Sequence, residues 1–111
     1  MIKSVIDQTN LDTLTFNVRN LSGEDYTTVY GKRELIRNRV SNKGNDVAAD
    51  YIKQWFEKYN LEIEDHNYRR GGRNIIATQV GTEYPDEAYI ICSHYDAVAD
   101  YCADDLSLIH I

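Results

Sequence analysis

The sequence predicts an α/β fold, in which helices flank a mixed, mainly parallel sheet and the C-terminal part of the fold is missing. Three observations support this prediction. The expected elements run in the order helix, helix, strand, strand, strand. Residues 45–59 carry a wide apolar stripe, typical of a helix that packs on a core. Residues 88–92 are apolar on both faces, as in a central strand covered on both sides.

The first part of the chain is expected to be partly helical. Within residues 1–21, apolar side chains recur at spacings of three and four at Leu11, Leu14, Val18 and Leu21. This spacing places them on one helix face. The Ser-Gly-Glu-Asp sequence that follows breaks the pattern.

The strongest helix signal lies between Asn45 and Tyr59. Its apolar stripe contains Val47, Ala48, Tyr51, Ile52, Trp55, Phe56 and Tyr59. Asn45 is the expected N-cap, and Asn60 is expected to end the helix in a left-handed conformation. An aromatic stripe at helical spacing is typical of core packing and does not require a ligand.

The second half of the chain predicts strands and turns. Residues 61–66 alternate between apolar and polar and predict an edge strand. A basic Gly-Gly turn over residues 69–73 leads to a second strand at 74–80. Residues 81–87 contain Gly and Pro and predict a loop before the third strand at 88–92.

Composition excludes some classes of function. The chain has 111 residues and a net charge of −6, which argues against a nucleic-acid partner. No apolar run is long enough for a membrane span, and the N-terminus shows no signal peptide. A basic cluster at Lys32, Arg33, Arg37, Arg39 and Lys43 is interpreted as a solvated surface or a helix end.

The stretch after the third strand carries the chemistry. Ligands of open α/β sheets gather at the carboxyl ends of strands, where Ser93 to Asp96 are expected. His94 offers an imidazole nitrogen to a divalent metal, and Asp96 can bond the other ring nitrogen. Asp104 and Asp105 follow as carboxylates, and one carboxylate can bridge two metals ~3.5–4 Å apart. A His with carboxylates suits catalytic Zn²⁺.

Other candidate ligands are interpreted differently. Cys92, within the apolar run, is expected in the core, while Cys102 lies beside the metal pattern and remains a possible ligand. Asp100 is interpreted as a loop carboxylate, and His66 as a surface residue. The two cysteines are too few for a disulfide framework.

At this point the motifs resemble a known family. They are Gly44-Asn45-Asp46-x-Ala48-Ala49-Asp50-Tyr51-Ile52-x-x-Trp55-Phe56, Asn60-Leu61-Glu62-Ile63, Arg73-Asn74-Ile75-Ile76-Ala77, Ser93-His94-Tyr95-Asp96 and Ala103-Asp104-Asp105. In this order, across roughly residues 20–105, they resemble the N-terminal part of zinc-dependent aminopeptidases of the aminopeptidase Y and bacterial leucyl aminopeptidase type.

The resemblance implies a zinc exopeptidase fold, phosphorylase/hydrolase-like, with two Zn²⁺ ions and peptide substrates. It implies that His94 binds one zinc, that Asp104 bridges both, and that Asp96 orients His94 as a catalytic residue. Asp105 would shape the loop beside the bridging residue. In the family, zinc activates water and polarises the peptide carbonyl, and a Glu is the general base. Family members are often secreted or periplasmic, so the compartment stays open.

The chain departs from the family after Asp105, where Leu106 replaces the expected Asn and small residues. The general-base Glu and the remaining ligands are expected after this point, so we expect residues 1–105 to be the N-terminal part of a peptidase domain without activity of its own. Two alternatives are a single-zinc acyltransferase similar to glutaminyl cyclase and a non-catalytic binding domain of the same fold.

The last six residues predict a non-native tail. Leu106-Ser107-Leu108-Ile109-His110-Ile111 is what CTG TCT CTT ATA CAC ATC encodes, which is the transposase mosaic-end adapter of sequencing libraries. We therefore expect protein sequence to end at Asp105, and His110 is not expected to bind metal. A natural apolar C-terminal strand is the alternative interpretation.

Overall fold

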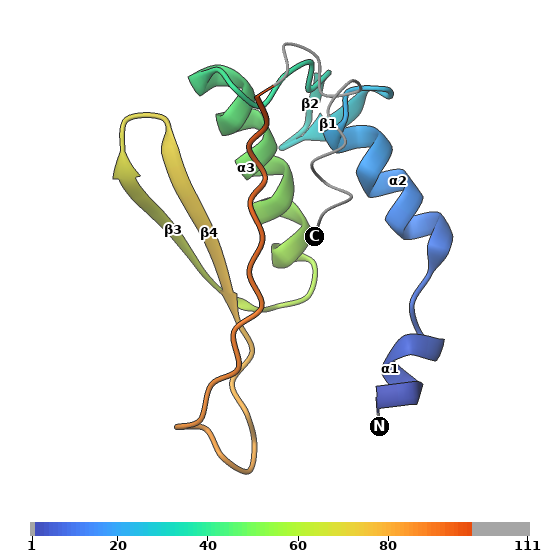
Figure 1. The fold of residues 1–111 in the computed structure, drawn as a ribbon, viewed down its shortest axis with the longest axis vertical. Helices are drawn as coiled ribbons and strands as arrows, with labels where there is room; N and C mark the ends of the chain where they lie inside the picture. The colour runs from blue at the N-terminus through green and yellow to red at the C-terminus, as the bar shows by residue number, and fades with distance from the viewer. Residues whose placement is uncertain (1, 99–111) are drawn as a thin grey trace.

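The computed structural model describes residues 2–98, which form three helices and two antiparallel hairpins (Figure 1). In chain order the elements are α1 (Ile2–Asp7), α2 (Leu11–Leu21), β1 (Thr27–Val29), β2 (Lys32–Glu34), α3 (Asn42–Glu57), β3 (Glu62–Arg69) and β4 (Gly72–Thr78). α3 lies between α2 on one side and the β3–β4 hairpin on the other (Figure 1).

The predicted fold class is wrong. β1 pairs only with β2, and β3 pairs only with β4, and both pairs are antiparallel, so residues 2–98 contain no parallel sheet. The physical reason is the length of the connections. Parallel neighbours need a crossover of about a dozen or more residues, usually a helix. The β3–β4 turn is far shorter, and residues 79–87 are a loop without a helix.

The N-terminal helices are confirmed. Asn10 caps α2 by accepting a hydrogen bond from the backbone N–H of Thr13 at 3.0 Å. The apolar face of α2 is only partly covered, because Leu11, Leu14 and Val18 remain exposed.

The predicted central helix is confirmed as α3, but its start is different. Ser41 is the N-cap, with its hydroxyl accepting from the Gly44 N–H at 3.1 Å, and the expected cap Asn45 lies in the first turns. The expected left-handed Asn60 is confirmed by its φ of 53°, but the helix ends at Glu57 and not at Tyr59. Sequence patterns identify helices more securely than their terminal residues.

Both hairpins depend on backbone with positive φ in their turns. Tyr30 and Gly31 join β1 to β2 with φ of 47° and 79°, the two positive values that a type I′ turn requires. Gly71 has a φ of 73° between β3 and β4, inside the turn predicted for residues 69–73. The two predicted strands at 61–66 and 74–80 therefore form one hairpin, β3–β4.

The core is small and centres on α3. Its buried side chains are Val29, Ile36, Ala48 and Tyr51. Partly buried side chains pack against them: Leu21, Val47, Ile52, Trp55 and Tyr95. This arrangement confirms most of the apolar stripe of the helix as core, but Tyr59, at its end, is 62% exposed. The Tyr51 hydroxyl also ties α2 to α3, donating to Asn17 Oδ1 at 2.6 Å and accepting from Asn20 Nδ2 at 3.0 Å.

The predicted third strand is wrong. Residues 79–98 have no regular secondary structure, and in Figure 1 they form an orange loop beyond the end of α3 and then a darker orange to red segment that passes α3. Tyr89, Ile90 and Ile91 are 96%, 85% and 100% exposed, and Cys92 is exposed instead of in the core. A strand requires a partner for its backbone N–H and C=O groups, and no described strand pairs with residues 88–92.

No helix among residues 2–98 combines the length and the apolar character that crossing a membrane requires.

Candidate functional site

The structure brings two of the three predicted site residues together. His94 Nδ1 lies 3.0 Å from the backbone oxygen of Asp96 and 3.3 Å from its carboxylate Oδ1. Both side chains are open to solvent, with 58% and 69% of their surfaces exposed. Because the chain is extended here, residues two apart point to the same side. The predicted pairing of His94 with Asp96 therefore has a geometric basis in the backbone.

The geometry at His94 suits a metal ligand. A backbone carbonyl oxygen and a carboxylate oxygen only accept hydrogen bonds, so the contact requires the proton on Nδ1. In the neutral ring the lone pair then lies on Nε2, which is the nitrogen left for a metal ion. An imidazole whose other nitrogen donates to an oxygen is the usual form of a metal-binding His. The contact with Asp96 thus leaves Nε2 of His94 as one possible ligand atom for a divalent metal ion.

Three hydrogen bonds hold this segment on the fold. Arg39 Nη1 donates to the backbone oxygen of Tyr95 at 2.9 Å, and the N–H of Ala97 donates to the backbone oxygen of Arg39 at 3.1 Å. The Tyr95 hydroxyl donates to the backbone oxygen of Arg73 at 2.9 Å. Tyr95 packs against the core and Ala97 is buried. Residues 95 and 97 therefore face the protein, and residues 94 and 96 face solvent.

Arg73 anchors the start of β4 to α3 beneath Tyr95. Its guanidinium contacts Asp65 at 2.6 Å, Asp50 at 2.8 Å and Asp46 at 3.4 Å. Lys53 also reaches Asp65, at 3.2 Å. The Arg73 side chain is only 13% exposed, so these charge pairs are partly shielded from water.

The ion pairs of Arg73 shift the pKa of Asp65 and of Arg73 itself. Hydrogen bonding to Arg73 lowers the pKa of Asp65 to about 2, against the opposing effect of desolvation, and Lys53 adds to the lowering. The hydrogen bond to Asp65 likewise raises the pKa of Arg73. Asp65 therefore stays ionised in the folded protein at any pH above about 2.

Several predicted site residues lie outside the described part of the chain. Asp104, the predicted bridging ligand, is among residues 99–111, as are Asp105, Asp100, Cys102 and His110. Among residues 2–98, no group of three or more His, Cys, Asp or Glu side chains could hold a metal ion. His66 is exposed on β3, as predicted for a surface residue, with Nδ1 3.4 Å from Asn74 Nδ2.

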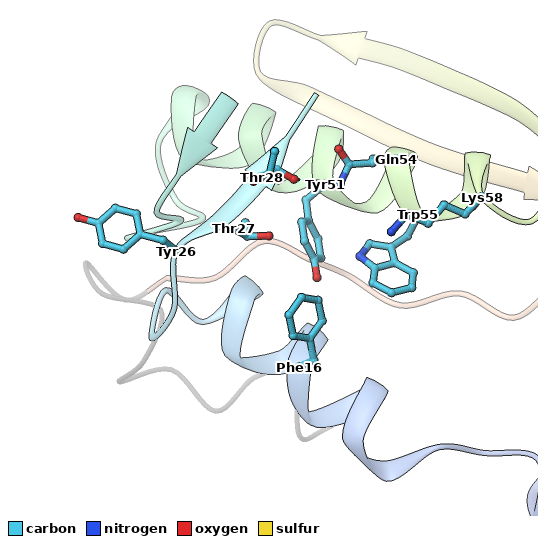
Figure 2. A pocket seen from close by; sticks show the side chains of 8 residues that line it. All are labelled: Phe16, Tyr26, Thr27, Thr28, Tyr51, Gln54, Trp55 and Lys58. Carbon is cyan, nitrogen blue, oxygen red and sulfur yellow. Dashed lines mark hydrogen bonds between the residues drawn. The ribbon is translucent and has the colours of Figure 1, made fainter. Parts of the chain in front are cut away.

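The structure also has a hollow of about 330 Å³ at the junction of α2, β1 and α3 (Figure 2). Its lining residues are Phe16, Tyr26, Thr27, Thr28, Tyr51, Gln54, Trp55 and Lys58. Two of its polar side chains, Gln54 and Lys58, already have partners. Gln54 bonds the backbone of Tyr30 and Thr28, and the Lys58 ammonium lies 4.1 Å from the Trp55 ring centre. None of the predicted site residues lines this hollow.

The residues that support the site were not identified from the sequence. Arg39 was assigned to a basic surface cluster, but it is 0% exposed. The sequence places Arg73 in a charged turn and gives Tyr95 no role of its own. The sequence does contain one signal for the role of Arg73. Asp46 and Asp50 lie four positions apart in the predicted helix, so their carboxylates are one turn apart and one cation can contact both.

Comparison with known proteins assigns no family to the chain. No family model matches it, and no curated protein or solved structure shows a significant match either.

Proposed function

We propose that this chain carries part of the metal site of a co-catalytic two-zinc exopeptidase, which removes N-terminal residues from peptides. His94 binds one zinc ion, Asp104 bridges the two ions, and Asp96 orients His94. The observation that carries the proposal is the contact of His94 Nδ1 with Asp96, which leaves Nε2 for a metal. The order of motifs from residue 44 to residue 105 adds the family resemblance.

The residues of the chain have separate tasks in this proposal. When bound, the zinc ions would polarise the peptide carbonyl and lower the pKa of water. Asp96 holds the proton on Nδ1 of His94 through its backbone oxygen and carboxylate. The exposure of both side chains leaves room for further ligands and for a peptide terminus.

Residues 1–111 lack a Glu-Glu pair and contain no ligand set beyond Asp105 that matches the family. In the proposal, the general base and the other ligands come from further residues of a longer protein. We therefore expect the 111-residue chain to bind zinc weakly and to leave peptides uncleaved, because two ligands hold a metal poorly.

A zinc titration of the full chain, followed by the ¹⁵N and ¹H signals of its histidine rings, tests the proposal. We expect the His94 ring signals to move first, and we expect His94→Ala to weaken zinc binding by about tenfold or more. Asp104→Ala is expected to have a similar effect. His66→Ala is the matched control, since no carboxylate within residues 2–98 pairs with this exposed His and its loss should leave binding unchanged.

Two outcomes would contradict the proposal. Zinc binding that is unaffected by His94→Ala would remove His94 from the site. Tight stoichiometric zinc with rapid peptide cleavage by the 111-residue chain would show that its own residues complete a different site.

A further inference from the structure

We propose that Arg39 and Tyr95 are positioning residues that set the ring proton of His94, by holding residues 95–97 extended and fixed on the core. The inference deepens the proposed function and rests on it for the metal role of His94. The effect of Arg39 and Tyr95 passes through the backbone that carries the Asp96 oxygen.

The first step concerns the two sides of Asp96. The Arg39 guanidinium donates to the backbone oxygen of Tyr95, the residue before Asp96, at 2.9 Å. The backbone oxygen of Arg39 accepts from the N–H of Ala97, the residue after Asp96, at 3.1 Å. The side chain and the backbone of one buried residue thus hold both neighbours of Asp96. Such a two-point contact limits rotation of the peptide groups around Asp96, including the one whose oxygen meets His94 at 3.0 Å.

The second step concerns the direction of the side chains. Tyr95 is held at both ends, since its backbone oxygen meets Arg39 and its hydroxyl meets the Arg73 oxygen at 2.9 Å. Its ring also packs against the core. With Tyr95 turned inward, the alternation of an extended chain turns His94 and Asp96 outward together.

The third step concerns what holds Arg73 in place. The guanidinium of Arg73 is paired with carboxylates from α3 and β3, at 2.8 Å to Asp50 and 2.6 Å to Asp65. The acceptor of the Tyr95 hydroxyl is therefore part of a cross-linked junction between helix and hairpin. The position of His94 thus depends, through Tyr95, on the ion-paired junction around Arg73.

The consequence is a preferred tautomer of the His94 ring, with the proton on Nδ1. A free histidine side chain prefers the proton on Nε2, whereas the contact with Asp96 requires it on Nδ1. If Arg39 and Tyr95 maintain this contact, the Nδ1–H form is populated before any metal arrives. The metal then meets an Nε2 lone pair that is already exposed.

The test measures the ring ¹⁵N shifts of His94 in the full chain without metal, at a pH of about 8, where an ordinary imidazole is neutral. We expect Nδ1–H to be the major form. In Arg39→Met we expect the ratio of the two forms to return to that of a short Ser-His-Tyr-Asp peptide. Arg39→Lys keeps one donor for the Tyr95 oxygen and should restore part of the preference. Arg37→Met is the control, because Arg37 is exposed.

Tyr95→Phe provides a second variant in case loss of the buried Arg39 unfolds the chain. It keeps the ring and removes only the hydroxyl bond to Arg73. We expect a smaller shift of the same sign in the tautomer ratio, with the far-ultraviolet circular dichroism unchanged. A role confined to stability would lower the melting temperature and leave the ratio unchanged in the folded chain.

The outcomes separate this inference from the proposed function. A wild-type His94 with its proton on Nε2, or a ratio unmoved by Tyr95→Phe and by folded Arg39 variants, overturns the positioning role whatever zinc does. A ratio that responds as expected supports it, even if a zinc titration shows no binding at His94. In that case the zinc proposal fails alone.

Discussion

Two regions of this chain pack very differently, although the less packed region has the higher share of apolar residues. In residues 20–78, strands are paired and Ile36 and Tyr51 are 1% and 2% exposed. In residues 79–93, Ile90 and Ile91 are 85% and 100% exposed. The difference shows that hydrophobicity alone does not bury a segment. The backbone must also find hydrogen-bond partners, and the first region provides its own through two hairpins.

The segment directly after the second region packs differently from that region. Residues 95–97 are attached to the first region by Arg39 and Arg73, and Ala97 is 5% exposed. The candidate site therefore lies where a segment that belongs to no sheet makes contact with the core. Its geometry depends on side chains of the first region, which lie far away in the sequence.

The largest expected effect is the difference in the free energy of unfolding between one Ile→Ala substitution in the first region and one in the second. Ile36→Ala should lower the free energy of unfolding by about 2–5 kcal/mol, because it leaves a cavity in a small core. Ile91→Ala removes the same atoms from a fully exposed side chain and should change it by less than about 0.5 kcal/mol. Urea unfolding of both variants measures the contrast. Equal losses would mean that Ile91 is buried in solution.

The next effect tests the junction between helix and hairpin. Arg73→Met should cost about 1.5–3 kcal/mol, since Asp65 and Asp50 lose charge-assisted hydrogen bonds in a partly buried place. Chemical denaturation measures the loss. Arg70→Met, at the exposed neighbouring turn, is the control and should be close to neutral. A neutral Arg73→Met would show that the carboxylates find other partners.

The smallest effect is a dependence of stability on pH. The pKa of Asp65 is lowered from 3.8 to about 2 in the folded protein, chiefly by Arg73. Its contribution is therefore complete above pH 3.8 and is lost as the pH falls through about 2. We expect a contribution on the order of 1 kcal/mol after screening by solvent.

Thermal unfolding between pH 5 and pH 2 measures this contribution as the difference between wild type and Asp65→Asn. The difference should shrink toward low pH and should fall with added salt. A difference that stays constant across this range would assign the stabilisation to packing instead of charge.

Local elements could be predicted because their causes are local. The apolar stripe of α3, the glycine turn between β3 and β4 and the left-handed Asn60 all depend on residues a few positions apart. The pairing of His94 with Asp96 belongs here too, since extended backbone brings alternate side chains to one side. The sequence by itself determined these features.

The fold class and the support of the site were decided by tertiary structure. Whether residues 88–92 become a strand depends on a partner strand, and none of the strands within residues 2–98 pairs with them. Arg39 reads as a surface charge in the sequence, yet folding buries it and directs it to Tyr95, 56 positions along the chain. Hydrogen bonds at such separations follow from packing, because only the folded chain brings the two groups within reach of each other.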